Sequence, residues 1–294
     1  MTEKELAVVR RAFAKQILAR AGVAGNETLE RALCSVRRED FLGDDPWIIA
    51  DITGATATLP SNDPVYAYQD VLFVLSSSRG ANNGSPSLHA RLLTTLAPQA
   101  GQRVAHIGAG TGYYSALLAQ IVGPQGRVLA IEYDETLAGR AQAALRKYPN
   151  VEVIVDDAAH WPREEVDCLY VNFAVTAPQE RWIEGLAPGG RLILPLGVPG
   201  LPKRPGGPRY SQQGAVFLFR REVSGFSAAH ICGASFIHAE GRAGGDTHGE
   251  TEKLKDAFTS SAAEFVRSLV WQRPADPGRC WLSTPAWSLS YDPV

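Results

Sequence analysis

Two periods in the placement of apolar residues predict that this chain mixes helices and strands. Near the start, apolar residues recur at helical spacing, which predicts an amphipathic helix over residues 2–20. Asn26 stands before a second helical pattern, and asparagine is a favoured helix N-cap. From residue 103 to residue 195, short apolar runs alternate with helical stretches. This alternation is typical of a doubly wound α/β sheet.

The stretch from Arg103 to Glu132, RVAHIGAGTGYYSALLAQIVGPQGRVLAIE, contains the clearest structural unit. An apolar strand over 104–107 ends abruptly at Gly108, and a helical run follows the glycine-rich turn. A second strand over 128–131 ends at Glu132, about 20 residues after the last glycine. Nucleotide-binding β-α-β units place a carboxylate there, where it bonds the ribose hydroxyls. The stretch therefore predicts a site for a nucleotide-type cofactor.

The spacing of the glycines narrows the class of cofactor. The turn reads G-x-G-x-G and consists of Gly108, Ala109, Gly110, Thr111 and Gly112. Glycine permits positive φ and lets the backbone approach a ligand closely. A dinucleotide-binding loop reads G-x-G-x-x-G, and this chain has no glycine at the third dehydrogenase position. The alternative is a tight strand-to-helix turn that holds no ligand.

At these residues the chain resembles the S-adenosylmethionine-dependent methyltransferases, and among them the protein-L-isoaspartate O-methyltransferase family. HIGAGTGYYSALLAQIVGPQGRVLAIEYD is similar to the first two motifs of that family. Downstream, VEVIVDDAAHWP, VDCLYVNFAV and LAPGGRLILPLG fall where its later motifs do. Upstream, VRREDFL and AYQDVLF resemble its N-terminal segments. The resemblance covers about residues 36–241.

The resemblance implies a Rossmann-like, doubly wound, seven-stranded and mostly parallel sheet, with N-terminal helices and a C-terminal helical extension. We expect three parts along the chain. Residues 1–80 would form a helical and irregular cap on the substrate side, and residues 81–241 the S-adenosylmethionine-binding methyltransferase domain. Residues 242–294 would form a linker and the helical extension.

Four further expectations concern the second half of the chain. Strands over 215–219 and 229–236 would form the antiparallel edge of the sheet. The stretch 196–213 is rich in Pro and Gly and predicts an exposed loop, made basic by lysine and arginine. Apolar residues at helical spacing predict a long helix over 254–270. The tryptophan-rich tail after it would pack onto the domain or onto a second subunit, so a homodimer through the extension is one expectation.

The resemblance implies S-adenosyl-L-methionine as the cofactor. It implies that Glu132 holds the ribose hydroxyls and that Asp157 accepts a hydrogen bond from the adenine amino group. For Asp157 the alternative is a loop acid at a strand end. The full set of implied cofactor-binding residues is Gly108, Ala109, Gly110, Thr111, Gly112, Glu132, Tyr133, Asp157, Ala158 and Asn172.

The segment before the helix that starts at Pro86 carries the implied catalytic residues. In the family, a Thr-Ile-Ser stretch there contacts both cofactor and substrate. Here Asn82, Asn83 and Gly84 stand at those positions, so the family serine is absent, although Ser85 follows directly. The catalytic candidates are therefore Ser85, Asn83 and Asn82. For Ser85 the alternative is that it only caps the helix.

The expected function is transfer of a methyl group to a carboxylate of a peptide or protein, either isoaspartyl or a modified-peptide carboxylate. A carboxylate is ionised at neutral pH and needs no general base, so alignment and desolvation carry the catalysis. A phenol or amine acceptor would need a base, for which His89 and His106 are candidates. The alternatives are a small-molecule O-methyltransferase of a biosynthetic pathway and a non-catalytic binding protein that keeps the cofactor fold.

Composition argues against several classes of partner. A formal net charge of −2 lacks the excess of Lys and Arg that a nucleic-acid interface needs. No apolar run approaches the roughly 20 residues of a membrane span, and the N-terminus lacks a signal-peptide core. The scattered cysteines are typical of reduced thiols, so we expect a cytoplasmic protein. The histidines show no metal-ligand spacing, and we expect no metal.

Overall fold

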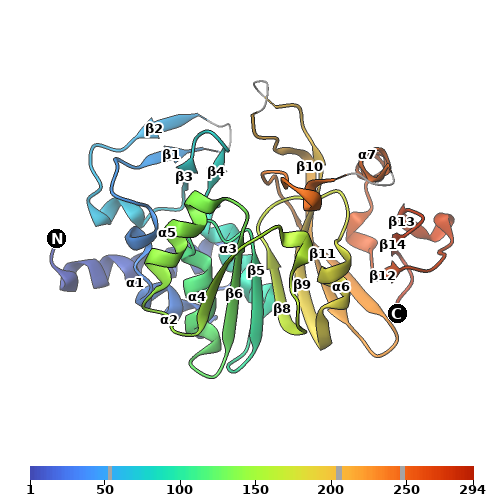
Figure 1. Cartoon of the computed structure of the whole chain (residues 1–294), viewed down its shortest axis with the longest axis horizontal. Helices are drawn as coiled ribbons and strands as arrows, with labels where there is room; N and C mark the ends of the chain where they lie inside the picture. Colours follow the sequence, from blue (N-terminus) through green and yellow to red (C-terminus); the bar gives the residue numbers. More distant parts are fainter. Residues whose placement is uncertain (52–54, 203–206, 246–248) are drawn as a thin grey trace. The chain divides into compact units, whose positions relative to one another are not determined.

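The chain consists of two compact units (Figure 1). The computed structural model describes residues 1–51, 55–202, 207–245 and 249–294. The first unit comprises Met1–Val104 and Ala109–Val155, and the second comprises Ala105–Gly108 and Asp156–Val294. Strand β5 (Arg103–Ile107) therefore contributes residues to both. The predicted division at residues 80 and 241 does not coincide with these units and stays a prediction.

The N-terminal part of the first unit is helical, as predicted. Helix α1 (Glu3–Arg20) begins at Thr2, which forms a capping box with Glu5. Helix α2 (Glu27–Ser35) begins at Asn26, whose side chain accepts a hydrogen bond from the backbone N–H of Leu29. The Asn26 cap is the predicted one, whereas Thr2, which the prediction included in the helix, is instead the residue that caps it.

An irregular segment follows the first two helices. Its antiparallel sheet has the order β2-β1-β3-β4, and one short 3-10 helix precedes β1 while a second connects β2 to β3. The bounds of these elements are η1 (Arg38–Phe41), β1 (Ile48–Ala50), β2 (Thr56–Thr58), η2 (Pro64–Ala67), β3 (Leu72–Ser76) and β4 (Ala81–Asn82). The prediction of irregular structure with short strands is confirmed.

A buried arginine in η1 organises this irregular segment. The guanidinium of Arg38 donates to the carbonyl oxygens of Ala67 (2.7 Å), Gln69 (2.7 Å) and Val71 (3.2 Å). Its carbon Cζ also lies 5.0 Å from the centre of the Phe73 ring. The side chain is fully buried, and burial lowers its pKa. A fixed fork of donors thus replaces regular strand pairing as the support for these carbonyls.

The rest of the first unit contains the predicted β-α-β arrangement. Strands β6 (Arg127–Glu132) and β7 (Val151–Val155) pair in parallel, and α4 (Tyr113–Val122) and α5 (Glu135–Leu145) contact them (Figure 1). Helix α3 (Pro86–Leu96) contacts α1. Parallel strands joined by crossover helices confirm the α/β class.

The second unit contains one seven-membered strand order, β13-β14-β12-β11-β10-β9-β8. Strands β8 and β9 are parallel, and the other neighbours are antiparallel. Helix α6 (Glu180–Glu184) connects β8 to β9. The strand bounds are β8 (Val166–Val171), β9 (Leu186–Pro199), β10 (Ser211–Arg221), β11 (Phe226–Gly233), β12 (Ser268–Trp271), β13 (Cys280–Ser283) and β14 (Trp287–Ser290).

The two predicted edge strands are present as β10 and β11, and β12, β14 and β13 extend the edge beyond them. The predicted loop over 196–213 is shorter than expected, because β9 continues to Pro199 and β10 begins at Ser211. Two of its basic residues, Lys203 and Arg204, lie outside the described residues.

The prediction of one long helix over 254–270 was wrong. Helix α7 (Glu250–Ser260) ends where Ser261 and Ala262 take positive φ of 59° and 69°, which a continuing helix does not allow. A short 3-10 turn, η5 (Ala263–Phe265), leads into β12. The apolar residues Val266, Leu269 and Val270 fit a strand as well as a helix, and pairing of β12 with its neighbouring strands decides the outcome.

The tryptophan-rich tail packs onto the second unit's own sheet. The ring centre of Trp281 lies 5.5 Å from that of Phe217 on β10 and 5.2 Å from that of Phe258 on α7. Trp287 is buried as well, whereas Phe265 is 63% exposed. The tail thus packs onto its own unit, which is one of the two expectations, and the homodimer stays a prediction.

Truncation after Gly245 should unfold the second unit. It would remove three strands and leave β11 and the aromatic side of β10 exposed to water. Loss of a single large aromatic side chain from a core costs about 3–5 kcal/mol, and this truncation removes more than one. Urea unfolding followed by far-ultraviolet circular dichroism would test this. An unchanged cooperative transition in the truncated protein would mean that the tail is only an appendage.

Candidate functional site

The glycine-rich turn of the first unit adopts the backbone geometry that the sequence predicts. Gly110 and Gly112 have φ of 58° and 95°, which favour glycine. Gly112 is the N-cap of α4, and a Cβ atom there would lie 2.6 Å from Cδ1 of Leu145. These positions therefore require glycine to bring the turn tightly against the start of the helix.

Glu132, at the end of β6, is tied directly to this turn. Its Oε2 accepts a hydrogen bond from the N–H of Gly110 (2.7 Å), and its Oε1 accepts one from the N–H of Asp134 (3.0 Å). The residue is 9% exposed, and burial raises the pKa of its carboxyl group, while the two N–H donors act in the opposite direction. A carboxylate has about four acceptor positions, so Glu132 retains capacity for ligand hydroxyls.

Three other predicted residues of the first unit differ in their contacts. The hydroxyl of Thr111 donates to the carbonyl of Phe41 (2.7 Å), and the N–H of Ala109 donates to the carbonyl of Ile131 (3.0 Å). Both interactions hold the turn in place. Tyr133 is 49% exposed.

The asparagines of the predicted substrate segment shape its backbone. Oδ1 of Asn82 accepts a hydrogen bond from the N–H of Gly84 (2.9 Å). Asn83 is buried and pairs with Phe73 on β3, donating its N–H to the Phe73 carbonyl (3.0 Å) and accepting the Phe73 N–H at Oδ1 (2.8 Å). These contacts fix the segment but do not test a role in catalysis.

Ser85 forms part of a capping network around Asp70. Its hydroxyl donates to Oδ1 of Asp70 (3.1 Å), which also accepts the N–H of Ser87 (3.0 Å). The same hydroxyl caps α3 by accepting the N–H of Leu88 (3.5 Å). The other oxygen of Asp70 lies 2.8 Å from Nε of Arg20. This geometry favours the interpretation that Ser85 only caps the helix. Asp70 was not among the predicted site residues, although it lies in AYQDVLF, one of the segments that carry the family resemblance.

His89 packs against the predicted substrate segment. Its ring stacks on Tyr114 with ring centres 3.8 Å apart. Gly84 has a φ of 68°, and a Cβ atom there would lie 2.0 Å from Nε2 of His89. The buried imidazole thus occupies the space that any side chain at position 84 would need. This packing gives His89 a structural task and does not favour the general-base alternative.

In the second unit, Asn172 and Gly108 lie close together. A Cβ atom on Gly108 would lie 2.8 Å from Cδ1 of Phe173 and 3.7 Å from Cβ of Asn172. Nδ2 of Asn172 lies 2.6 Å from Nε2 of His106. His106 is fully buried, and burial lowers its pKa to about 3, so the imidazole is neutral. His106 therefore positions Asn172 and is a poor candidate for a general base.

Asp157 joins two segments of the second unit. Its Oδ1 accepts the N–H of Ala159 (2.9 Å), and its Oδ2 accepts the N–H of Arg242 (2.8 Å). The carbonyl of Ala158 accepts a hydrogen bond from Nε1 of Trp182 (3.0 Å). These two bonds fit the alternative in which Asp157 is a loop acid that holds the backbone. Its carboxylate keeps further acceptor positions, and the hydrogen bond from the adenine amino group stays a prediction.

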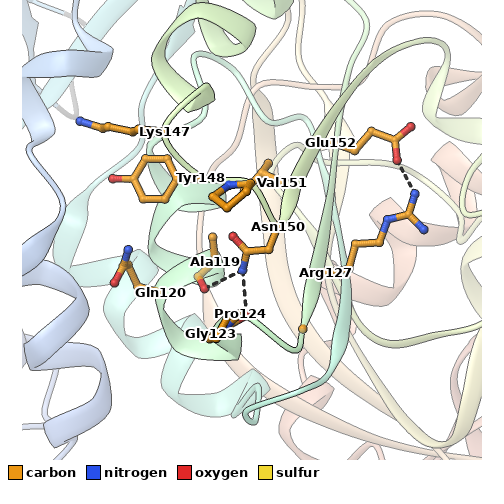
Figure 2. Close-up of a pocket in the computed structure, with 12 residues that line it drawn as sticks. Ala119, Gln120, Gly123, Pro124, Arg127, Lys147, Tyr148, Asn150, Val151 and Glu152 are labelled. Carbon is orange, nitrogen blue, oxygen red and sulfur yellow. Dashed lines mark hydrogen bonds and ion pairs between the residues drawn. The ribbon is translucent and has the colours of Figure 1, made fainter.

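A pocket in the first unit is lined by none of these residues (Figure 2). Arg127 and Val151 begin β6 and β7, so this pocket is at the amino ends of those strands, whereas Glu132 is at the carboxyl end of β6. Nδ2 of Asn150 donates to the carbonyls of Ala119 and Gly123 (3.0 and 2.9 Å). The pocket is therefore at the strand ends opposite to Glu132, and it is not the predicted cofactor site.

Three further observations bear on the predicted classes. Among the residues that the structure describes, no helix combines the length and apolar character needed to cross a membrane. Within the same ranges, no group of three His, Cys, Asp or Glu side chains is arranged to hold a metal ion. All four cysteines are described, and none of them is in a disulfide.

Comparisons with known proteins agree on one family. The model of the family "Protein-L-isoaspartate(D-aspartate) O-methyltransferase (PCMT)" matches residues 55–203. The protein-L-isoaspartate O-methyltransferase of Aeropyrum pernix is 39% identical over 140 residues, which are 46% of this chain and 53% of that protein. The one from Thermotoga maritima is 24% identical over 266 residues, 88% of this chain and 75% of that protein. The match spans only about half the length of the Aeropyrum protein and of a second relative, from Archaeoglobus fulgidus.

Two solved structures resemble the fold. A protein-L-isoaspartate O-methyltransferase has a TM-score of 0.64 at 23% identity and covers 90% of this chain and 72% of that chain. A second, from Plasmodium falciparum in complex with S-adenosyl-L-homocysteine, has a TM-score of 0.58 at 15% identity and covers 78% and 96%. At these identities the likeness shows the fold.

Proposed function

The chain belongs to the protein-L-isoaspartate(D-aspartate) O-methyltransferase family, and on this premise we propose that it transfers a methyl group from S-adenosyl-L-methionine to a carboxylate of a peptide or protein. The observation that carries the proposal is the bond between the Gly110 N–H and the buried Glu132 carboxylate. It joins a positive-φ glycine turn to an acid at a strand end, which is the arrangement of a nucleoside-binding β-α-β unit.

The residues of the first unit fit the proposed cofactor. Gly110 keeps the turn free of a side chain, and Glu132 would accept hydrogen bonds from ribose hydroxyls. The cofactor would supply a methyl group that its sulfonium already activates. The roles of Asp157, Ala158, Tyr133 and Asn172 toward the cofactor stay predictions of the resemblance.

Two histidines support a carboxylate acceptor over a phenol or an amine. The pKa of His106 is about 3, so its imidazole is not suited to take a proton at neutral pH. The buried ring of His89 stacks on Tyr114 and fills the space beside Gly84, so its packing is structural. An aspartyl-type carboxylate has an ordinary pKa near 4 and is already ionised at pH 7. Aligning and desolvating that oxygen is then the main task of the protein.

The identity of the peptide carboxylate is the finer part of the proposal. The relatives are named protein-L-isoaspartate O-methyltransferases, which supports an isoaspartyl residue as the acceptor. Ser85 carries the hydroxyl nearest to the position of the family serine, and this hydroxyl donates to Asp70. This supports a methyl acceptor that is held by contacts other than the family's serine. We therefore propose a carboxylate of a modified peptide as a second candidate for the methyl acceptor. Methylation of a small molecule and a non-catalytic role are the alternatives, and the intact glycine turn weighs against the latter.

A labelled-methyl assay would test the proposed function. The protein would be incubated with labelled S-adenosylmethionine and either an isoaspartyl peptide or its normal aspartyl counterpart. We expect a base-labile methyl ester, because an ester of a carboxylate hydrolyses readily whereas an ether or a methylamine does not. Preference for the isoaspartyl peptide would identify the repair-type acceptor. No ester on any peptide, together with methylation of a small hydroxylated compound, would contradict the proposal.

Two expectations about the setting of the protein accompany this function. A cytoplasmic location is supported by the four cysteines, none of which is in a disulfide, since oxidising compartments favour disulfides. A homodimer through the C-terminal extension stays a prediction. The buried positions of Trp281 and Trp287 show that these side chains are covered within one chain.

A further inference from the structure

Two buried polar side chains near the carboxyl end of β8 lack hydrogen-bond partners within the described part of the chain. Thr176 is 1% exposed, and its hydroxyl is unpaired. His238 is 4% exposed, and both of its ring nitrogens are unpaired. A buried polar group without a partner destabilises a fold, so such groups call for an explanation.

The backbone around His238 is well bonded, so the unpaired atoms are confined to its side chain. Ala174 and His238 form a parallel bridge, in which the N–H of Ala174 donates to the carbonyl of Ile237 (2.8 Å). The N–H of Ala239 donates in turn to the carbonyl of Ala174 (2.9 Å). The side chains of residues opposite each other in a bridge point to the same face. The imidazole of His238 therefore lies on the same face as the small methyl group of Ala174.

The end of β9 holds Val175, the residue directly before Thr176. The N–H of Val175 donates to the carbonyl of Pro195 (3.1 Å), and the N–H of Gly197 donates to the carbonyl of Val175 (2.9 Å). Thr176 follows this bonded residue directly. Three segments thus meet beyond the carboxyl end of β8, which is where ligands bind in open α/β sheets.

Another buried threonine of the same unit shows what a purely structural hydroxyl does. Oγ1 of Thr284 donates to the carbonyl of Trp287 (2.8 Å) and accepts the Trp287 N–H (3.1 Å). Both capacities of this hydroxyl are used within the turn. The contrast with Thr176 favours a role for Thr176 that is completed by another molecule.

The chemistry of the two side chains indicates an uncharged partner. Burial lowers the pKa of His238, and the positive charge of Arg209 acts in the same direction. Backbone groups of Ala239 and Gly197 raise this pKa in part, yet neither meets hydrogen-bond geometry with a ring nitrogen of His238. A neutral imidazole offers one donor and one acceptor, and a hydroxyl offers both. This set matches a peptide amide better than a carboxylate or phosphate, which needs donors or cations only.

We propose that Thr176 and His238 bind a main-chain amide of the acceptor peptide and so help to determine which peptides are methylated. The inference rests on the proposed function, because it assigns these residues to recognition of the same acceptor. They act in binding and take no part in the methyl transfer itself.

The test compares four variants of the full chain: Thr176→Val, His238→Leu, His238→Gln and Thr284→Val. The measured quantities are KM and kcat for an isoaspartyl peptide, the Kd of S-adenosylhomocysteine, and stability in urea. For Thr176→Val and His238→Leu we expect KM to rise roughly tenfold, the effect of one lost hydrogen bond. The kcat and the Kd should stay unchanged, and stability should be unchanged or higher. His238→Gln keeps a donor and an acceptor and should recover part of the lost affinity.

Thr284→Val is the matched control, which should lose stability without a change in KM. If Thr176→Val instead behaves like Thr284→Val, its hydroxyl is bonded by water or by the chain, and the inference is wrong. If the wild-type protein methylates no peptide, the proposed function fails. Calorimetry with the same peptide in the presence of S-adenosylhomocysteine then decides the inference separately. Peptide binding that Thr176→Val and His238→Leu weaken would support it, and no peptide binding, or binding that they leave unchanged, would overturn it.

Discussion

Replacing Arg38 with alanine should lower the free energy of unfolding by about 3–5 kcal/mol, because each buried carbonyl left without a donor costs about 1–3 kcal/mol. The guanidinium donates to the carbonyls of Ala67, Gln69 and Val71 and is fully buried. Its loss would leave three carbonyls without a donor and a gap beside Phe73. Urea unfolding at neutral pH would measure the change.

The neighbouring arginine supplies the control for this experiment. Arg37 is half-exposed and forms ion pairs with Glu39 and Asp40, so Arg37→Ala should cost less than about 1 kcal/mol. Arg38→Lys keeps the charge but not the planar fork of donors, and it should recover only part of the stability. Equal effects of Arg37→Ala and Arg38→Ala would mean that the buried network contributes no more than a surface ion pair.

Replacing Glu132 with alanine should weaken S-adenosylhomocysteine binding by about 10- to 100-fold, which corresponds to roughly 1.5–3 kcal/mol for hydrogen bonds to a charged group. The variant loses the proposed acceptor for the ribose hydroxyls. It also releases the N–H groups of Gly110 and Asp134, which now donate to this carboxylate. Isothermal titration calorimetry would measure the affinity. Glu135→Ala, in the exposed first turn of α5, is the control and should leave the Kd unchanged.

The pH dependence of stability gives a second measurement on Glu132. Burial raises its pKa in the folded state above the ordinary value of 4.5, so the folded state holds the proton to higher pH than the unfolded state. The contribution is therefore fully present below 4.5 and is lost as pH rises through the folded pKa. The stability of the wild-type protein relative to Glu132→Gln should fall across that window. An unchanged affinity in Glu132→Ala, or a flat difference with pH, would refute the role assigned to this carboxylate.

The sequence by itself determined the features that depend on residues close together along the chain. Thr2 and Asn26 are helix caps because each bonds an N–H three residues ahead. The glycine turn before α4 follows from the need for positive φ, and its position between two apolar strands indicated the β-α-β unit. Glu132 was identified because it ends a strand at the spacing that such units use.

Only the tertiary structure decided the features that depend on distant residues. Arg38 bonds carbonyls 29 to 33 positions away, and no local pattern distinguishes it from the exposed Arg37 beside it. The hydroxyl of Ser85 could face a substrate or a cap, and Asp70, 15 positions earlier, accepts its hydrogen bond.

The C-terminal segment and the unpaired side chains of the second unit show the same limit. The apolar positions between Val266 and Val270 suit a helix or a strand, and Ser268–Trp271 forms strand β12 because β11 and β14 offer backbone partners. Thr176 and His238 are ordinary residues in the sequence and became candidates only when folding buried them without partners. The physical reason is that propensity, capping and periodicity act over a few residues. Strand pairing and burial are set by contacts between segments far apart along the chain.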